Sequence, residues 1–243
     1  MFWRKQRAAI EGFHPLHQSL IWHRSFSVSM RPAEWDALIR GLARHESVVR
    51  RRRWRLPART RTALVPLVRV LTEDMRPDGV LSVALDLRGP KFPEKTGPRH
   101  EMPVQRPVTS MKQWFVVDPW LRLRAELRDG SVLELAVTDR IRYRRIRKRN
   151  PRGKIKVKYK TKKVLRVDAT RRLAKAAAVR RPASPPPGWI VVRVKDGPRP
   201  VIRATAKIPA AADERALVEP ILTVSTELFR WTPPGTGAQR RTA

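Results

Sequence analysis

The sequence contains no cysteine, so disulfide bonds and thiolate metal sites are excluded. It has no apolar run approaching the roughly 20 residues of a membrane-spanning helix. Its charged amino-terminal segment also lacks the apolar stretch of a signal peptide. We therefore expect a protein without a transmembrane segment that is not exported and is located in the reducing cytoplasm.

Acidic residues are the second scarce class. The 243 residues include 21 Asp and Glu but 54 Lys and Arg, which sets the formal net charge at +33. A charge of this size favours acidic partners, with nucleic acid first and an acidic protein or an anionic membrane surface as alternatives. The hydrophobic content of 41% and the eight Trp argue against a disordered chain.

Catalytic motifs are absent as well, since the sequence has no Walker loop, dinucleotide fingerprint or catalytic Cys. His14, His17 and His23 lie close together but lack the carboxylate-partnered spacing of a metal motif, so we expect ordinary surface or core histidines. Ser110 and Lys112 have no accompanying oxyanion site. We assign no catalytic or metal-ligating residue and expect no cofactor.

A metal-dependent nuclease is the one enzymatic alternative that remains. Asp78 and Asp86 lie near Lys91 in the sequence and would hold Mg²⁺ beside a phosphate if the fold brought them together. Arg88 stands where such a site usually carries a lysine, which weakens this alternative.

Hydrophobic periodicity predicts an α+β fold, made mainly of antiparallel β-hairpins with about three helices. Alternating residues predict strands, and apolar residues at helical spacing predict helices, with Pro66 close to the start of one helix and Asp168 as a possible cap of another. Strands are expected at 25–30, 79–87, 120–137, 140–167 and 189–208; helices at 32–46, 63–71, after 168 and at 213–231; and a long loop at 89–110.

The hairpin at 120–137 allows its register to be predicted. A three-residue loop with Gly130 in a left-handed bulge pairs Leu121 with Val137 and Leu123 with Leu135. One face of the hairpin is then wholly apolar. A two-residue turn would instead divide these apolar residues between the two faces.

Charge is concentrated between residues 140 and 181, where twenty Lys and Arg accompany the single Asp168, so this segment carries 19 of the 33 net charges. An arginine excess also arises from GC-rich coding, but seven of the fourteen Lys fall between 148 and 163, which such a bias does not explain. The segment 140–167 is predicted to form a hairpin with a type I turn at 150–153 and a bulge at Ile146.

The return strand of this basic hairpin alternates strictly. Lysines at the even positions from Lys154 to Lys162 lie on one face, and apolar residues and Thr161 lie on the other. The alternative is an edge strand on which lysines only prevent aggregation, for which one or two lysines suffice. Basic side chains of this hairpin and of the arginine-rich segment 50–61 are therefore expected to contact phosphates: Arg142, Arg144, Arg147, Lys148, Arg149, Arg152, Lys154, Lys156, Lys158, Lys160, Lys162, Lys163, Arg51, Arg52, Arg53 and Arg55.

Three aromatic residues lie among these basic side chains. Tyr143, Tyr159 and Trp54 would stack on bases if they were exposed, but the two tyrosines fall on the apolar sides of their strands, where core packing is the usual role. Binding to the nucleic-acid backbone, non-enzymatic and without strong sequence preference, is the function that these patterns favour.

The expected domain organisation follows from composition. Residues 1–180 form a basic α+β domain that includes the hairpin at 140–167, and residues 181–188 form a proline-rich linker or loop. Residues 189–231 form a hairpin and a carboxy-terminal helix packed on the first part. Residues 232–243 are expected to be disordered.

Overall fold

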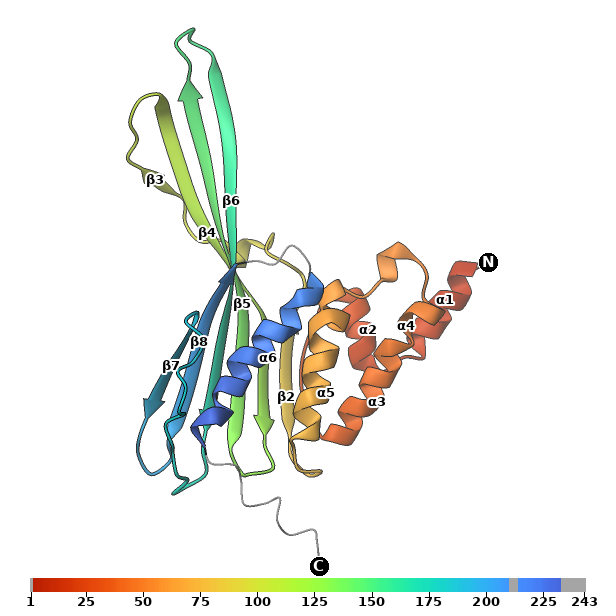
Figure 1. Cartoon of the computed structure of the whole chain (residues 1–243). Helices are drawn as coiled ribbons and strands as arrows, with labels where there is room; N and C mark the ends of the chain where they lie inside the picture. The colour runs from red at the N-terminus through yellow and green to blue at the C-terminus, as the bar shows by residue number, and fades with distance from the viewer. Residues whose placement is uncertain (1, 210–213, 233–243) are drawn as a thin grey trace, which may run out of the picture.

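The computed structural model describes residues 2–209 and 214–232, which form an α+β fold around one antiparallel sheet. The sheet has eight strands, seven in the order β1-β2-β4-β5-β6-β8-β7, while β3 pairs with β4 (Figure 1). The strands are β1 (Ser25–Met30), β2 (Leu81–Asp86), β3 (His100–Met102), β4 (Val108–Glu126), β5 (Val132–Arg149), β6 (Ile155–Arg172), β7 (Ile190–Lys195) and β8 (Val201–Pro209).

Helices cover one face of this sheet (Figure 1). The described residues contain six α-helices, so the expectation of about three was too low. None of them is long and apolar enough to cross a membrane. They are α1 (Phe2–Glu11), α2 (Pro15–Trp22), α3 (Pro32–Ala43), α4 (His45–Val48), α5 (Val65–Glu73) and α6 (Val218–Glu227).

The core lies between the helices and the sheet. Alternate residues of β2 point toward the helices, and α5 buries Leu67, Val68 and Leu71 against the same layer. Trp35 of α3 is fully buried, and its indole Nε1–H donates to the carbonyl oxygen of Leu81 at 3.0 Å. This bond satisfies the one polar atom of a large apolar side chain and joins α3 to the sheet.

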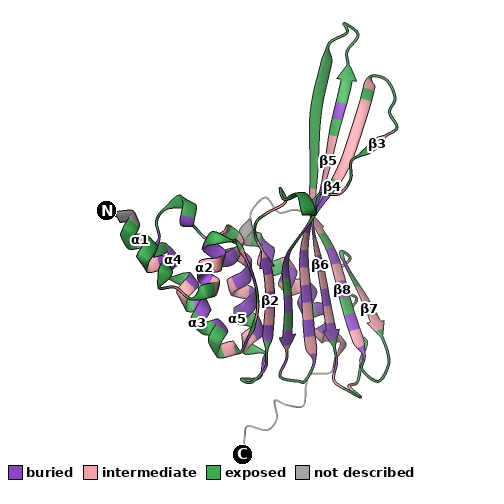
Figure 2. Ribbon diagram, turned by 180° about the vertical axis from the view of Figure 1, so that it is seen from behind, coloured by how far each residue is buried: buried purple, intermediate pink, exposed green. Residues whose placement is uncertain are grey.

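Strands β4, β5 and β6 are 19, 18 and 18 residues long and continue well beyond the helices. We call this extension the blade. It consists of residues 108–117 of β4, 140–149 of β5 and 155–163 of β6, with β3 along its β4 edge. Figure 2 shows the β6 part of the blade exposed and its β4 part mostly of intermediate exposure, whereas the strands below it alternate between buried and more exposed residues.

The predicted register of the hairpin at 120–137 is confirmed. Leu121 pairs with Val137 and Leu123 with Leu135, and all four side chains are buried. Gly130 has a φ of +78°, and its N–H donates to the carbonyl oxygen of Leu127 at 3.0 Å. The left-handed residue allows the three-residue loop, and the loop length places the apolar residues on one face.

Other expectations fare unevenly. The strands at 25–30 and 79–87 and the hairpin at 189–208 are confirmed, and β8 pairs with β6 along 164–172. The helix expected after Asp168 is wrong, because this residue lies within β6 and bonds to Arg166 and Thr205. The loop expected at 89–110 contains β3 and the start of β4.

Two further segments differ from their expected bounds. The helix at 32–46 is divided between α3 and α4, and the helix near Pro66 begins at Val65 as α5. The expected helix at 213–231 is represented by α6 and two short 3-10 turns, with residue 213 outside the described residues. Residues 233–243 of the expected disordered tail also lie outside them.

A buried histidine pair joins α2 to α4. His17 Nε2 lies 2.9 Å from His45 Nδ1, and His45 Nε2 lies 3.1 Å from the carbonyl oxygen of Trp54. Since a carbonyl only accepts, His45 donates through Nε2 and accepts at Nδ1 from His17. His17 is thus a core histidine, as the sequence predicted. Burial, reinforced by His45, lowers the pKa of His17 from 6.5 to about 4.

Replacing Gly130 should destabilise the fold through backbone conformation alone. A Cβ at this position meets its nearest atom, Ala174 Cβ, at 3.8 Å, so it has room. We expect Gly130→Ala to lower the free energy of unfolding by about 1–2 kcal/mol, because an L-residue is disfavoured at this φ. Gly188→Ala is the control: its Cβ enters open space without a left-handed φ, so it should be neutral or stabilising by up to about 1 kcal/mol. Equal losses in denaturant titrations would contradict the explanation.

The histidine pair should make stability depend on pH. The folded pKa of His17 is depressed, so between pH 6.5 and about 4 the unfolded chain binds a proton that the folded chain does not. The free energy of unfolding should therefore fall as the pH decreases through this window. His45 adds to the effect, because burial lowers its pKa too. In denaturant titrations at pH 7 and pH 5, His17→Gln should show a smaller difference than the native chain; an unchanged difference would exclude His17 as the source.

Candidate nucleic-acid interface

One face of the blade, which we call the lysine face, is built from cations on β5 and β6. Residue pairing across these strands places Arg142 opposite Lys162, Arg144 opposite Lys160 and Lys148 opposite Lys156. Lys158 lies opposite Ile146 on the same face. The expected alternation of β6 is therefore confirmed, whereas the bulge expected at Ile146 is wrong, since β5 and β6 pair without a register shift.

The two cations of each of these three pairs repel each other at close range. Side chains directly opposite on neighbouring strands have Cβ atoms about 4.5–5.5 Å apart, and like charges there are destabilising. Residues 140–163 contain seven Arg and seven Lys and no acidic residue, so no anion within this segment offsets the repulsion. Among the six cations of these three pairs, only Arg144 has a described side-chain partner: its Nε–H donates to Gln113 Oε1 at 2.6 Å.

The other face of the blade, which we call the aromatic face, continues the side of the sheet that the helices cover lower down. Trp114, Tyr143 and Thr161 form one row across β4, β5 and β6. The next row toward the tip brings Arg145 opposite Tyr159. Arg147 and Val157 follow in the row beyond. Three of the sixteen proposed phosphate contacts, Arg147, Arg149 and Lys163, thus lie on this side of the sheet rather than on the lysine face.

The tip of the blade is the turn expected from the sequence. The N–H of Gly153 donates to the carbonyl oxygen of Asn150 at 3.0 Å, and the side chain of Asn150 accepts from the N–H of Lys154 at 2.7 Å. Gly153 has a φ of +80°. Arg152 and Lys154 are exposed within this turn. The tip is therefore ordered by local hydrogen bonds that leave its cations available to a partner.

The outer edge of β6 is open along the blade. Strand β8 pairs with β6 only from Val164 to Arg172, and no other described strand pairs with that edge between Ile155 and Lys163. An open edge normally carries a charged residue that blocks further strands. The lysines meet that need, but Arg142 and Arg144 lie on β5, an interior strand of the blade, where edge protection is not required.

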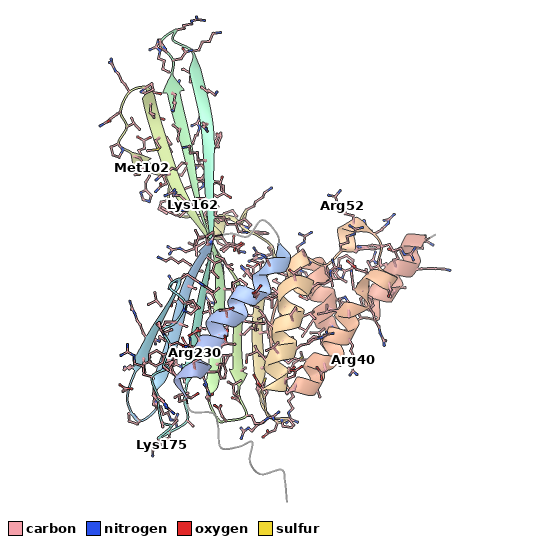
Figure 3. All side chains as sticks on the ribbon, in the orientation of Figure 1. Arg40, Arg52, Met102, Lys162, Lys175 and Arg230 are labelled. Atoms are coloured by element: carbon pink, nitrogen blue, oxygen red, sulfur yellow. The ribbon has the colours of Figure 1, made fainter. Side chains whose placement is uncertain are left out.

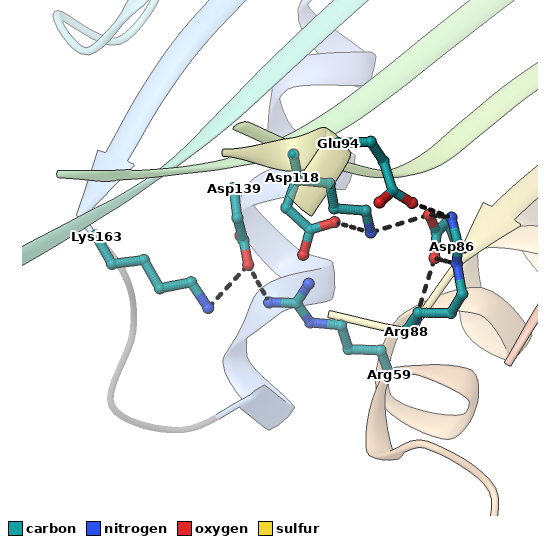
Figure 4. Close-up of polar contacts among 8 residues, drawn as sticks. Arg59, Asp86, Arg88, Glu94, Asp118, Asp139 and Lys163 are labelled. Atoms are coloured by element: carbon teal, nitrogen blue, oxygen red, sulfur yellow. Dashed lines mark hydrogen bonds and ion pairs between the residues drawn. The ribbon is translucent and has the colours of Figure 1, made fainter. Parts of the chain in front are cut away.

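Lys163 was proposed as a phosphate contact, but its ammonium forms an ion pair at the base of the blade. Its ammonium lies 2.9 Å from Asp139 Oδ2, which also accepts from Arg59 at 2.7 Å (Figure 4). Asp139 is buried and lies on the core side of β5. Lys163 therefore satisfies a buried carboxylate and is not available on the lysine face.

A second set of ion pairs lies beside it. Lys95, 5% exposed in its side chain, bridges Asp118 Oδ1 at 2.7 Å and Asp86 Oδ2 at 2.9 Å, and Arg88 binds Asp86 and Glu94. Burial alone would raise the pKa of Asp86, but hydrogen bonds from Arg88 and Lys95 outweigh it and hold that pKa well below the usual carboxyl range. The eight side chains of Figure 4 carry no net formal charge: Arg59, Arg88, Lys95, Lys163, Asp86, Glu94, Asp118 and Asp139.

This arrangement does not bring together the carboxylates of the nuclease alternative. Asp78 precedes β2 and pairs with Arg76 at 3.8 Å, whereas Asp86 ends β2, five residues after Leu81. The two are thus separated by the length of the strand, on the order of 17 Å or more. No group of three or more His, Cys, Asp or Glu among residues 2–209 and 214–232 is placed to hold a metal ion.

In the arginine-rich segment at 50–61, Arg59 reaches Asp139 at the base of the blade, but the arginines proposed as phosphate contacts lie apart from the blade. Figure 3 shows Arg52 beside the amino-terminal helices and Lys162 at the base of the blade. Trp54 is 2% exposed and packs under the guanidinium groups of Arg51 and Arg53, at 5.6 and 4.4 Å from its ring centre. The idea that Trp54 stacks on bases is therefore wrong. The structure does not unite Arg51, Arg52, Arg53 and Arg55 with the hairpin cations.

Two contributors to the interface were missed from the sequence. Trp114 stacks on Tyr143, and Arg99 lies over the Trp114 ring, 5.0 Å from its centre. Arg99 belongs to the segment 89–110, which was expected to be a loop, and Trp114 lies between that segment and the hairpin expected at 120–137. Nothing local in the sequence indicates that β4 pairs along the blade. Residues 114–117 are all apolar, so the sequence offered no alternation that would assign them to the two faces of a strand.

Removing Lys95 should destabilise the base of the blade strongly. Lys95→Met leaves Asp86 and Asp118 near each other without their shared cation, and breaking a buried pair costs about 3–5 kcal/mol. Lys112→Met is the matched control, because its ion pair with Glu101 is exposed and should be worth no more than about 1 kcal/mol. Equal changes in the free energy of unfolding would show that the buried network does not hold the blade's base.

A network of paired charges thus lies at the base of the blade, and among the described residues the lysine face above it carries no acidic side chain. Comparison with protein-family models, with curated proteins and with solved structures finds no match. The function is therefore inferred from the chemistry of the blade itself.

Proposed function

We propose that the chain binds the phosphate backbone of nucleic acid, RNA or DNA, through the lysine face of the blade. The observation that carries the proposal is the set of like-charge pairs across β5 and β6, in which Arg144 and Lys160 are representative. Such pairs weaken a free hairpin. A polyanion relieves their repulsion and gains entropy from the counterions that it releases.

The dimensions of the lysine face support this binding mode. Alternate residues of a strand are about 6.6–6.8 Å apart, so the row from Lys156 to Lys162 extends roughly 20 Å. The arginines of β5 form a second row beside it. Phosphates of one DNA strand rise about 3.4 Å each along the helix axis, so the two rows are able to contact several consecutive phosphates. Contacts of this kind bind without reading the bases.

An acidic protein or an anionic membrane surface is the alternative partner. Both would use the same cations, and exposed Phe115 and Val117 on the β4 part of this face add apolar area that a membrane interface would accept. Nucleic acid is favoured because the cations form parallel rows along a rigid strand pair, which match a linear array of phosphates. Affinities for RNA, DNA and anionic vesicles measured side by side separate these partners.

Neutralising the lysine face should weaken binding through charge alone. Lys154, Lys156, Lys158 and Lys160 changed together to Gln should leave the fold intact, because all four are exposed. Affinity for RNA and DNA should fall by a similar factor for every sequence. The slope of log affinity against log salt should drop by up to about 3.6 for duplex DNA and about 2.8 for a single strand.

The control removes the same charge elsewhere. Lys5, Lys175, Lys195 and Lys207 are exposed and lie outside the blade, so changing them to Gln lowers the net charge equally. This variant should keep most of the native affinity and salt dependence. Equal weakening by both variants would mean that binding follows total charge, and tighter binding to vesicles than to nucleic acid would favour the membrane alternative.

A further inference from the structure

The aromatic face of the blade has the features of a base-stacking surface. The rings of Trp114 and Tyr143 are stacked with centres 5.4 Å apart and planes 16° apart, and the Arg99 guanidinium lies over the Trp114 ring. The stacked rings run across the strands, from Trp114 on β4 to Tyr143 on β5. A further flat ring, such as a base, stacks readily on a row of this kind.

The next position in the row is occupied by a small residue. Thr161 of β6 lies opposite Tyr143, and it is exposed. A threonine side chain is too small to cover a phenol ring, so the β6 side of Tyr143 has room for a base. Tyr159 lies two residues before Thr161 in β6, on the same face, and is 65% exposed. Two tyrosines thus border a place that no described aromatic fills.

The β6 part of this face toward the tip is apolar and uncovered. Lower in the sheet the same side of β5 and β6 is buried under helices, but in the blade Ile155 is 53% and Val157 is 40% exposed. Exposed apolar side chains in a contiguous stripe indicate a binding surface. Packing within the chain therefore does not account for Tyr159, which sequence reasoning had treated as a core residue.

The charges beside the stripe select its partner. Arg145 lies opposite Tyr159, and Arg147 lies opposite Val157. Glu101 is the one acid on this face of the blade among the described residues, and it pairs with Lys112 at 3.0 Å. A surface that combines aromatic rings with unopposed arginines suits a ligand that has both flat rings and negative charge.

We propose that the aromatic face binds the bases of single-stranded nucleic acid, with Tyr143 and Tyr159 as stacking residues and Arg145 and Arg147 as phosphate contacts. This inference rests on the proposed function and assigns it a substrate class, because paired bases in a duplex do not expose their faces. A second copy of the chain is a poorer occupant. Strand pairing through the open β6 edge would bring two lysine rows together.

The test compares three probes with the same number of phosphates per strand, of about 12 nucleotides, within the usual site size of such surfaces. They are oligodeoxythymidylate, the same strand with abasic sugars in place of its bases, and a duplex with matching phosphates per strand. Tyr159→Ala removes an exposed ring, so the fold should survive. Tyr159→Phe keeps the ring and should retain native affinity for oligodeoxythymidylate.

The native chain should bind oligodeoxythymidylate more tightly than the abasic strand. Tyr159→Ala should reduce affinity for oligodeoxythymidylate by about five-fold or more, as expected for loss of one stacked base, and change the other two affinities by less than about two-fold. Equal affinities of the native chain for the base-containing and abasic strands, or an unaffected Tyr159→Ala variant, would overturn the stacking proposal.

The same data separate this proposal from the function on which it rests. If the fourfold lysine variant weakens binding to all three probes while Tyr159→Ala changes none of the three affinities, the proposal of backbone binding is supported and the proposal of base stacking is contradicted. If the native chain binds none of the probes, both proposals are contradicted. A Tyr159→Ala change that dissociates a dimer in sedimentation experiments, without altering oligodeoxythymidylate affinity, would assign the stripe to a second copy instead.

Discussion

Unbroken pairing between β5 and β6 is the constraint on which the rest of this structure depends. It runs from the pair of Val132 and Arg172 to that of Arg149 and Ile155 without a register shift. Because side chains alternate along a strand, the side that is core beneath the helices remains one continuous side up to the tip. The buried leucines of the body and the aromatic face of the blade therefore share one side, and the lysines at positions 156, 158, 160 and 162 lie on the other.

The transition between body and blade is electrostatic. Where β4 and β5 leave the helices, Asp118 and Asp139 are buried opposite each other and are neutralised by Lys95, Arg59 and Lys163. Burying charge is tolerated only when it is paired, and with Asp86, Arg88 and Glu94 included the eight charged side chains carry no net formal charge. Beyond this level the lysines of β6 are exposed, and repulsion between unpaired cations is screened by water and salt. A cationic blade is compatible with a stable fold because its charges meet solvent rather than the core.

Local sequence patterns were sufficient for features that depend on neighbouring residues. The register set by Gly130 and the alternation of the lysine strand follow from turn geometry and a two-residue period. The features that could not be predicted from the sequence depend on long-range packing. The pairing of β4 along the blade, the burial of Trp54 and the ion pairs of Lys95 join residues far apart in sequence, which no local pattern encodes. The first two helices were missed because α1 buries only Ile10 among its described side chains, so its apolar stripe is weak.

Lysine footprinting of the native chain tests the proposed phosphate contacts most directly. Acylation rates of individual lysines, measured by mass spectrometry with and without single-stranded nucleic acid, report which ammonium groups the ligand covers. Lys175 lies at the end of the sheet opposite the blade, as Figure 3 shows, and serves as an internal reference. The account predicts that Lys156, Lys158, Lys160 and Lys162 are protected on binding while Lys175 reacts as before. Uniform protection of all exposed lysines, or none on the blade, would contradict it.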